Sequence, residues 1–281
     1  MTIGGDKILN YGRHEIDAAD VEAVVEVLKS DFITSGPVIE KFEFELGQYL
    51  NNQNIVVCSN GTSALYLASK VLEIGQNDVV IVPSQTFLAT ASVPHMLGAE
   101  VVFSDVDPKT GLMDSISLED AILRARREFP TKRLSAIYVV HLNGQSVQMP
   151  AVREIARAND AFLIEDACHG LGGNVCFAPE SEPKKIGACQ YSDAATFSFH
   201  PVKNMTTGEG GAVAFPSIAH TVKAKIYRNH GVQYDNLTLV DNSLLPIGSW
   251  SHVMIEPSLN FRLPDVLCAL GISQLKRLNE F

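Results

Sequence analysis

The chain has little cysteine and no long hydrophobic run. Its five cysteines are odd in number and include no Cys-x-x-Cys pair, so the sequence indicates neither a disulfide framework nor a cysteine-rich metal motif. The longest apolar runs, such as residues 79–82, fall far short of the ~20 residues that a membrane-spanning helix needs. The N-terminus lacks the basic and then apolar order of a secretory signal. We therefore expect a protein of the reducing cytoplasm without a membrane span.

Positive charge is also scarce. The 22 lysines and arginines are outnumbered by 32 aspartates and glutamates, and the formal net charge is −10. This charge repels a nucleic-acid backbone, so we expect no nucleic-acid partner, and any anionic ligand must be held by a local cluster of donors. No repeat, low-complexity tract or Pro/Ser-rich linker divides the 281 residues. The hydrophobic content of 46% is therefore that of one ordinary globular, enzyme-sized unit.

Short apolar segments alternate with helical patterns along the chain. This rhythm predicts an α/β protein with a mainly parallel sheet and helices on both faces. Two helices are marked by apolar residues at helical spacing, which we expect to be core, and a third is expected over 264–278. The expected core residues are Val21, Val24, Val25 and Leu28 after a cap at Asp17, and Ala64, Leu65, Ala68, Val71 and Leu72 after Asn60. The expected strands are 55–58, 79–82, 100–104, 136–141, 162–166, 195–199 and 212–215.

A lysine follows the end of one expected strand. Lys203 lies within the run 198–211, where small residues and glycines surround it. An amine with so little bulk around it suits imine formation, provided that desolvation or a neighbouring cation depresses its pKa. A surface lysine in a glycine-rich turn explains this segment, taken alone, equally well.

A second segment joins a strand to a helix through small residues. In the run Ser59-Asn60-Gly61-Thr62-Ser63, free backbone N–H groups at a helix N-terminus could bind a phosphate dianion, with hydroxyls beside them. An ordinary N-cap is the competing interpretation, because Ser, Asn and Thr favour that position anyway.

Two carboxylates and a histidine follow a buried strand at 162–170. Glu165, Asp166 and His169 stand at its carboxyl end, where open α/β sheets bind ligands. A carboxylate here could keep a pyridine nitrogen protonated. An Asp/His metal pair and a histidine that merely caps a carbonyl are the alternatives, although further metal ligands at recognisable spacing are missing. Phe87 could cover a flat ring, but a phenylalanine at a strand end is more often core.

Together these segments resemble the DegT/DnrJ/EryC1/StrS family of sugar aminotransferases, which depend on pyridoxal 5'-phosphate (PLP). The resemblance extends along nearly the whole chain and appears in the family's order. It is carried by residues 10–12, 28–37, 42–43, 59–65, 83–87, 165–169, 198–211, 259–263 and 269–275.

The resemblance implies the large domain of a fold type I PLP-dependent transferase and a role for each matching residue. Lys203 would hold PLP as a Schiff base and move the proton during catalysis. The cofactor-binding set would be Gly61, Thr62 and Ser198 at the phosphate, Phe87 on the ring, Asp166 at the pyridinium nitrogen, His169 by the ring hydroxyl and Asn260 from a partner subunit. Tyr11, Asp31, Phe32, Ile33 and Thr34 would line the sugar-nucleotide site.

The same resemblance implies the reaction and the assembly. An amino acid, with glutamate favoured, would donate its amino group to a UDP-linked 4-keto-6-deoxy-N-acetylhexosamine for surface-glycan biosynthesis. The enzyme would be a homodimer with shared active sites. Residues 1–281 would be the large domain with its N-terminal segment, and the family's small C-terminal domain would be absent or truncated.

Two other interpretations stay open at this point. A truncated chain could be a fragment or dimer partner without activity, and it would expose apolar surface along the helix from Pro264 onward. A metal hydrolase using Asp166 and His169 is the remote alternative, and such an enzyme would lose activity to chelators.

Overall fold

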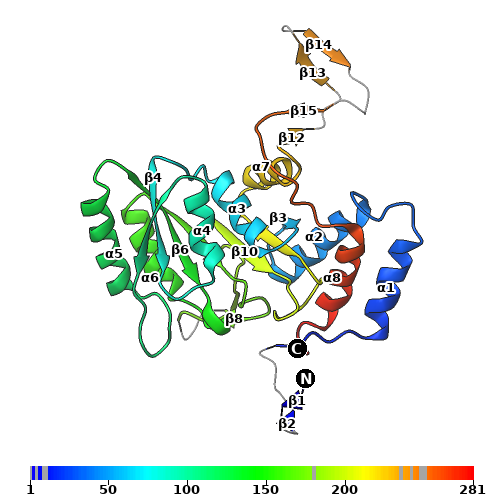
Figure 1. The fold of residues 1–281 in the computed structure, drawn as a ribbon, viewed down its shortest axis with the longest axis horizontal. Coiled ribbons are helices and arrows are strands. Elements are labelled where there is room, and N and C mark those ends of the chain that lie inside the picture. Colours follow the sequence, from blue (N-terminus) through cyan, green and yellow to red (C-terminus); the bar gives the residue numbers. More distant parts are fainter. Residues whose placement is uncertain are drawn as a thin grey trace.

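The computed structural model of the chain describes residues 2–3, 6–7, 12–178, 182–233, 237–240, 243–246 and 252–281. A seven-stranded sheet with the order β3-β11-β10-β7-β6-β4-β5 forms its centre (Figure 1). All neighbouring strands are parallel except for the two pairs that β11 makes, with β10 and with β3. The predicted mainly parallel sheet is confirmed. Its strands are β3 (Ile55–Cys58), β4 (Asp78–Pro83), β5 (Glu100–Ser104), β6 (Arg133–Val140), β7 (Phe162–Asp166), β10 (Ala194–Ser198) and β11 (Gly211–Ala214).

Helices cover both faces of this sheet. One face packs against α3, α4 and α7. The other packs against α5 and α6 over one half of the sheet, and against α2 and α8 over the half formed by β3, β11 and β10. The helices are α1 (Ala18–Leu28), α2 (Pro37–Leu50), α3 (Gly61–Val71), α4 (Leu88–Met96), α5 (Ser115–Glu128), α6 (Met149–Ala158), α7 (Ile218–Arg228), α8 (Asp265–Arg277) and the 3₁₀ turn Leu142–Gly144.

Short antiparallel strand pairs lie outside the central sheet. They are β1 (Thr2–Ile3) with β2 (Asp6–Lys7), β8 (Asn174–Val175) with β9 (Lys184–Lys185), β12 (Val232–Gln233) with β15 (Val253–Met254), and β13 (Leu237–Val240) with β14 (Ser243–Pro246).

Local sequence explains where the helices begin and which face they bury. Asn60 caps α3, its side-chain oxygen accepting a hydrogen bond of 2.8 Å from the Ser63 N–H. On α2, Phe42, Leu46 and Leu50 recur every four residues and are fully buried against the sheet. Each such side chain contributes about 1.5–3 kcal/mol to folding, so the apolar face holds α2 in place.

The predicted core face of α1 is wrong. Asp17 caps the helix as expected, but Val21, Val25 and Leu28 are 54%, 36% and 57% exposed. The side chains that α1 buries are Asp20 and Val27. Helix α1 packs against α8 and not against the sheet (Figure 1), and its contact face includes a polar residue that an apolar pattern cannot reveal.

The predicted helix over 264–278 is confirmed as α8, but its predicted exposed apolar surface is not. Helix α8 lies between α1 and α2 (Figure 1), and Cys268, Ile272 and Leu275 are buried. The exposed apolar side chains near α8 lie on α1, at Phe32 and Ile33, and at Phe281.

Candidate active site

Four of the predicted site residues, Gly61, Asp166, Ser198 and Lys203, lie at the edge of the sheet where the parallel strands end. Asp166 ends β7, Ser198 ends β10, and the turn after β3 leads to Gly61 at the start of α3. Lys203 lies in the connection between β10 and the antiparallel β11, at the same edge of the sheet. Carboxyl ends of parallel strands form the usual ligand crevice of open α/β sheets. The topology therefore brings together segments that are far apart in the sequence.

Asp166 is a buried carboxylate held on both oxygens. Its Oδ2 accepts a hydrogen bond of 2.7 Å from the hydroxyl of Thr90, and its Oδ1 accepts one of 3.2 Å from the N–H of Cys168. The Thr90 hydroxyl in turn accepts from Thr86 at 2.8 Å. Hydrogen bonds to both oxygens fix the position of the carboxyl group. The strand therefore presents an oriented carboxyl group to the crevice.

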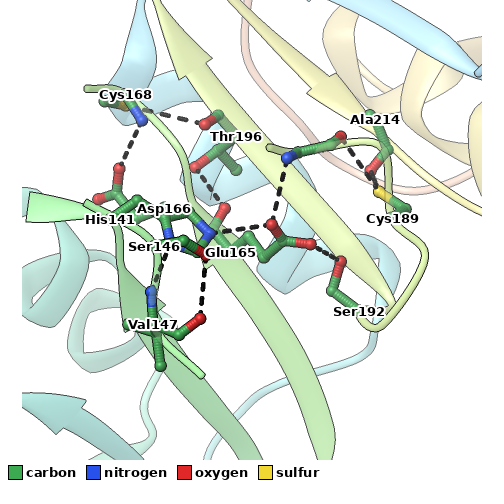
Figure 2. Close-up of polar contacts among 11 residues, drawn as sticks. His141, Ser146, Val147, Glu165, Asp166, Cys168, Cys189, Ser192, Thr196 and Ala214 are labelled. Carbon is green, nitrogen blue, oxygen red and sulfur yellow. Dashed lines mark hydrogen bonds and ion pairs between the residues drawn. The ribbon is translucent and has the colours of Figure 1, made fainter. Parts of the chain in front are cut away.

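Glu165 points to the opposite face of the sheet (Figure 2). Its carboxylate contacts the ring Nε2 of buried His141 at 2.9 Å, accepts from the Gly187 N–H at 3.2 Å, and accepts from the Ser192 hydroxyl. Because the Val147 N–H donates to the other ring nitrogen of His141, the neutral ring carries its proton on Nε2 and donates it to Glu165. Successive residues of a strand face opposite sides. Glu165 therefore makes structural contacts on the face of the sheet away from the crevice, and Asp166 is the one of these two carboxylates that faces the crevice.

Lys203, Asp166 and His169 lie within electrostatic reach of one another. Burial and the Lys203 ammonium lower the pKa of His169, and the Asp166 carboxylate partly opposes them. The ring is half-buried, and its Nδ1 accepts the N–H of Asn143 at 3.2 Å. His169 is therefore a neutral imidazole at neutral pH, with its remaining ring nitrogen as a donor.

The α3 N-terminus and the end of β10 approach each other closely. A Cβ placed on Gly61 would lie 2.9 Å from the Cβ of Ser198 and 3.3 Å from the Sγ of Cys168. A Cβ on Gly211 would lie 2.5 Å from the Asn60 carbonyl carbon, so this strand position also requires glycine. The first helical turn leaves the N–H groups of Gly61 and Thr62 without intrahelical acceptors. With the Ser198 hydroxyl beside them, these donors form a cradle suited to a phosphate.

Two thiols, those of Cys58 and Cys168, lie next to this cradle. Burial raises the pKa of Cys58 to about 12. Burial and the Asp166 carboxylate also raise the pKa of Cys168 well above its ordinary value. Both shifts favour the protonated thiol over the reactive thiolate at neutral pH.

Phe87 faces solvent at the N-terminus of α4. Its side chain is 71% exposed, so the core interpretation of this residue is wrong. It precedes the helix whose Thr90 bonds Asp166. The aromatic ring is therefore free to cover a ligand bound at Asp166.

Lys203 lines an open pocket with a volume of about 720 Å³. Other parts of the wall are residues 171–174, which follow His169, residues 13–15 near the N-terminus, and residues at the end of α8. The lysine is half-buried. The loop that carries Lys203 therefore borders an open pocket, and Asp166 and His169 are not among the residues that line it.

Two groups of predicted site residues do not line the Lys203 pocket. Asp31, Phe32, Ile33 and Thr34 are exposed and lie near the beginning of α8, where the Ile33 carbonyl accepts from the Val266 N–H at 3.4 Å. They do not belong to the described walls of the Lys203 pocket. Asn260 is exposed, bridges to Asn229 across an isolated β-bridge, and accepts from the Arg262 N–H at 3.1 Å. Tyr11 lies outside the described residues.

Sequence reasoning missed Thr90 and Gln274. Thr90 lies in an ordinary helical pattern, and only its contact with Asp166 marks it. Gln274 is buried, donates to the Glu15 carbonyl at 2.9 Å and to Asp20 at 2.6 Å, and accepts from the Thr206 N–H at 3.4 Å. It therefore links α8, the N-terminal segment and the Lys203 loop. In the sequence, the available signal for Gln274 was a polar residue among the apolar residues of the predicted helix 264–278.

Among the described residues, no group of three or more His, Cys, Asp or Glu side chains is arranged to hold a metal ion. Within that part of the chain, Asp166 and His169 are not accompanied by the third ligand that a zinc hydrolase uses. None of the helices in the described ranges has the length and hydropathy to cross a bilayer.

Known proteins resemble this chain along nearly its whole length. A UDP-4-amino-4,6-dideoxy-N-acetyl-beta-L-altrosamine transaminase of Campylobacter jejuni (serotype O:23/36, strain 81-176) is 36% identical over 273 residues, which are 97% of this chain and 65% of the relative. The spore coat polysaccharide biosynthesis protein SpsC of Bacillus subtilis is 32% identical over 272 residues, which are 97% of this chain and 65% of that protein. The chain thus spans about two thirds of the length of these relatives.

Solved structures show the same fold. Helicobacter pylori PseC, an aminotransferase involved in the biosynthesis of pseudoaminic acid, matches with a TM-score of 0.80 and 30% identity over 97% of this chain and 66% of its own. Spr1654 of Streptococcus pneumoniae, described as a sugar aminotransferase, matches in its PMP form with a TM-score of 0.82 and 28% identity over 97% of this chain and 68% of its own. These neighbours confirm the predicted fold type I α/β architecture.

The profile of one protein family matches residues 14–281. The chain therefore belongs to the DegT/DnrJ/EryC1/StrS aminotransferase family, whose aminotransferases depend on PLP.

Proposed function

We propose that this chain carries the cofactor-binding and catalytic residues of a PLP-dependent sugar-nucleotide aminotransferase. The observation that carries the proposal is the convergence of three groups at one edge of the sheet. They are a lysine in an open pocket, a doubly hydrogen-bonded carboxylate and a glycine-lined helix N-terminus. An amine, an anion for a ring nitrogen and a phosphate cradle are the set that PLP requires.

The residues present fit PLP in size and in charge. The phosphate would lie at the N–H groups of Gly61 and Thr62 and at the Ser198 hydroxyl, where only glycine leaves room at position 61. Phe87 would cover one face of the ring. His169, a neutral donor, would lie by the ring hydroxyl. Lys203 would anchor the cofactor covalently.

Two side chains of this protein would control protons. Asp166, fixed by Thr90 and the Cys168 N–H, would hold a proton on the ring nitrogen. When bound, PLP supplies the electron sink that makes the substrate C–H bond acidic. The Lys203 Nζ, as a free amine during turnover, would take that proton and return it to a neighbouring atom.

The names of the relatives support the substrate class. The transaminase of C. jejuni is named for an amino-dideoxy N-acetyl sugar linked to UDP, and PseC is described as an aminotransferase involved in the biosynthesis of pseudoaminic acid. We accordingly propose a UDP-linked 4-keto-6-deoxy-N-acetylhexosamine as the acceptor and glutamate as the amino donor. We also propose a cytoplasmic homodimer in which Asn260 of one copy reaches the phosphate cradle of the other and the stretch 31–34 approaches the sugar nucleotide.

Visible absorption tests the cofactor and its anchor. Purified chain mixed with PLP should show a visible band that borohydride reduction fixes covalently at Lys203, as located by peptide mass spectrometry. Lys203→Ala should show no such band, and adding L-glutamate to the parent should discharge it. The keto sugar nucleotide should then restore the band.

The competing interpretation makes the opposite prediction. A chain without a competent site would show no reducible band at Lys203, and this result would reject the proposed activity for the 281-residue form. Activity that chelators abolish and Lys203→Ala leaves unchanged would instead favour the metal hydrolase.

A further inference from the structure

The pocket beside Lys203 has a wall from the N-terminal segment. Arg13, His14 and Glu15 line it together with Lys203 and Asn204. None of these three N-terminal residues was expected to bind a ligand. Because they share this pocket with Lys203, the question arises which substrate group they could meet.

The backbone of this segment is held against the loop that carries Lys203. A Cβ on Gly12 would lie 3.2 Å from the Cα of Val202. The N-terminal segment therefore packs closely against the loop at the residue before Lys203. Three residues later, the Glu15 carbonyl accepts from Gln274, whose side-chain oxygen accepts from the Thr206 N–H. The backbone of Arg13 lies between these two attachments and is therefore held at the loop that carries Lys203.

The charges of the pocket make Arg13 the available cation. Within the described part of the chain, no ion pair or hydrogen bond of the Arg13 guanidinium occurs, and its side chain is exposed to the pocket. The nearby acid Glu15 lies 3.8 Å from Arg277. Glu280, the other acid of the wall, follows the end of α8. An unpaired guanidinium in the pocket that Lys203 also lines is suited to an anionic group of a substrate.

We infer that Arg13 binds a carboxylate of the amino donor, an inference that rests on the proposed function. The donor must bring its amino group to the position of the Lys203 amine, and its α-carboxylate is attached to the same carbon atom. That carboxylate must therefore lie close to Lys203. The planar guanidinium matches a carboxylate with two parallel hydrogen bonds. The diphosphate of a sugar nucleotide lies across the sugar ring from a reacting C4, so its contact with Arg13 is the weaker alternative.

Binding of glutarate, an unreactive dicarboxylate, tests Arg13 without turnover. Isothermal titration calorimetry should give a dissociation constant at least tenfold higher for Arg13→Gln than for the parent, because a hydrogen bond to a charged group is lost. Arg13→Lys keeps the charge but not the fork and should fall between them. Arg127→Gln, which removes an exposed arginine on α5, is the matched control and should bind glutarate like the parent.

Separate assays of the two half-reactions show whether Arg13 contacts the amino donor or the keto sugar nucleotide. Arg13→Gln should keep the reducible band at Lys203, discharge it at least tenfold less efficiently with L-glutamate, and restore it with the keto sugar nucleotide at the parent rate. Unchanged glutarate binding would overturn the inference. Weakened binding of UDP with unchanged binding of glutarate would do the same, since it would assign Arg13 to the acceptor. A parent chain without a visible band would reject the proposed function, yet the glutarate titration would still decide the role of Arg13.

Discussion

Neighbouring residues on one strand have separate roles in this protein. Glu165 and Asp166 are adjacent carboxylates at the end of β7, yet one contacts His141 behind the sheet and the other faces the crevice. Both are buried and both are hydrogen-bonded. The alternation of side chains along a strand turns Glu165 toward His141 and Asp166 toward the crevice.

Thr90 is expected to position Asp166. Its hydroxyl is the donor to Oδ2 at 2.7 Å, and Thr90→Val keeps the shape but removes that donor. Loss of a hydrogen bond to a buried carboxylate costs about 1.5–3 kcal/mol. We expect Thr90→Val to raise the dissociation constant of PLP by about tenfold or more and to shift the pH at which the visible band changes.

Thr90→Ser is the matched control, because it restores the hydroxyl. It should return both the PLP affinity and the pH profile to near the parent values. A Thr90→Val protein with the parent pH profile would show that Thr90 has only a packing role.

At the scale of elements, the contact between α1 and α8 is polar and buried. Asp20 on α1 accepts from Gln274 and from Arg277, each at 2.6 Å. Arg277 also lies 3.2 Å from Asp17. An acid at the centre of a helix contact ties α1 to α8 while leaving the apolar stripe of α1 on the surface.

The buried contact of Asp20 predicts how the stability of the fold changes at acidic pH. Burial opposes ionisation of Asp20, but hydrogen bonds from Ser273, the Asp17 region and Gln274, with the Arg277 charge, together lower its pKa. A carboxyl group whose pKa is lower in the folded state stabilises the fold at pH values above its unfolded-state pKa, which is near 3.9. This stabilisation is lost as the pH falls through the folded-state pKa. In urea unfolding, Asp20→Asn should be less stable than the parent at neutral pH, and the difference should shrink below about pH 4.

A constant difference between the two proteins over that pH range would contradict this account. Glu22→Gln is a suitable control, because Glu22 lies on the exposed side of the same helix. Its stability should stay within about 0.5 kcal/mol of the parent at neutral pH.

The whole molecule is organised around one mixed sheet, whose interior strands are better shielded from solvent than its edge strands. β7 and β10 lie inside the sheet and carry Asp166 and Ser198, whereas β5 is an edge strand whose Phe103 is half exposed. Hydrogen exchange detected by mass spectrometry should therefore show the slowest exchange in β7 and β10 and faster exchange in β5. Equal protection of edge and centre would mean that the sheet opens only by global unfolding.

Much of the architecture was predictable because its signals are local. Apolar runs between turn residues gave the seven strands to within a few residues, and the caps Asp17 and Asn60 gave two helix starts. The segments around Lys203, Asp166 and Gly61 were recognisable for the same reason, since each motif lies within a few neighbouring residues.

Long-range partners could not be predicted in this way. An apolar stripe indicates which side of a helix prefers burial, but not whether the chain offers a partner, so the stripe of α1 was placed in the core. The roles of Thr90 and Gln274, and the reversed direction of β11, depend on contacts between segments distant in sequence. The sequence by itself determined the elements and the reactive residue types, because these follow from local periodicity and chemistry. Only the tertiary structure decided which carboxylate faces the crevice and which arginine lines the pocket of Lys203, because both depend on packing between segments that are distant in the sequence.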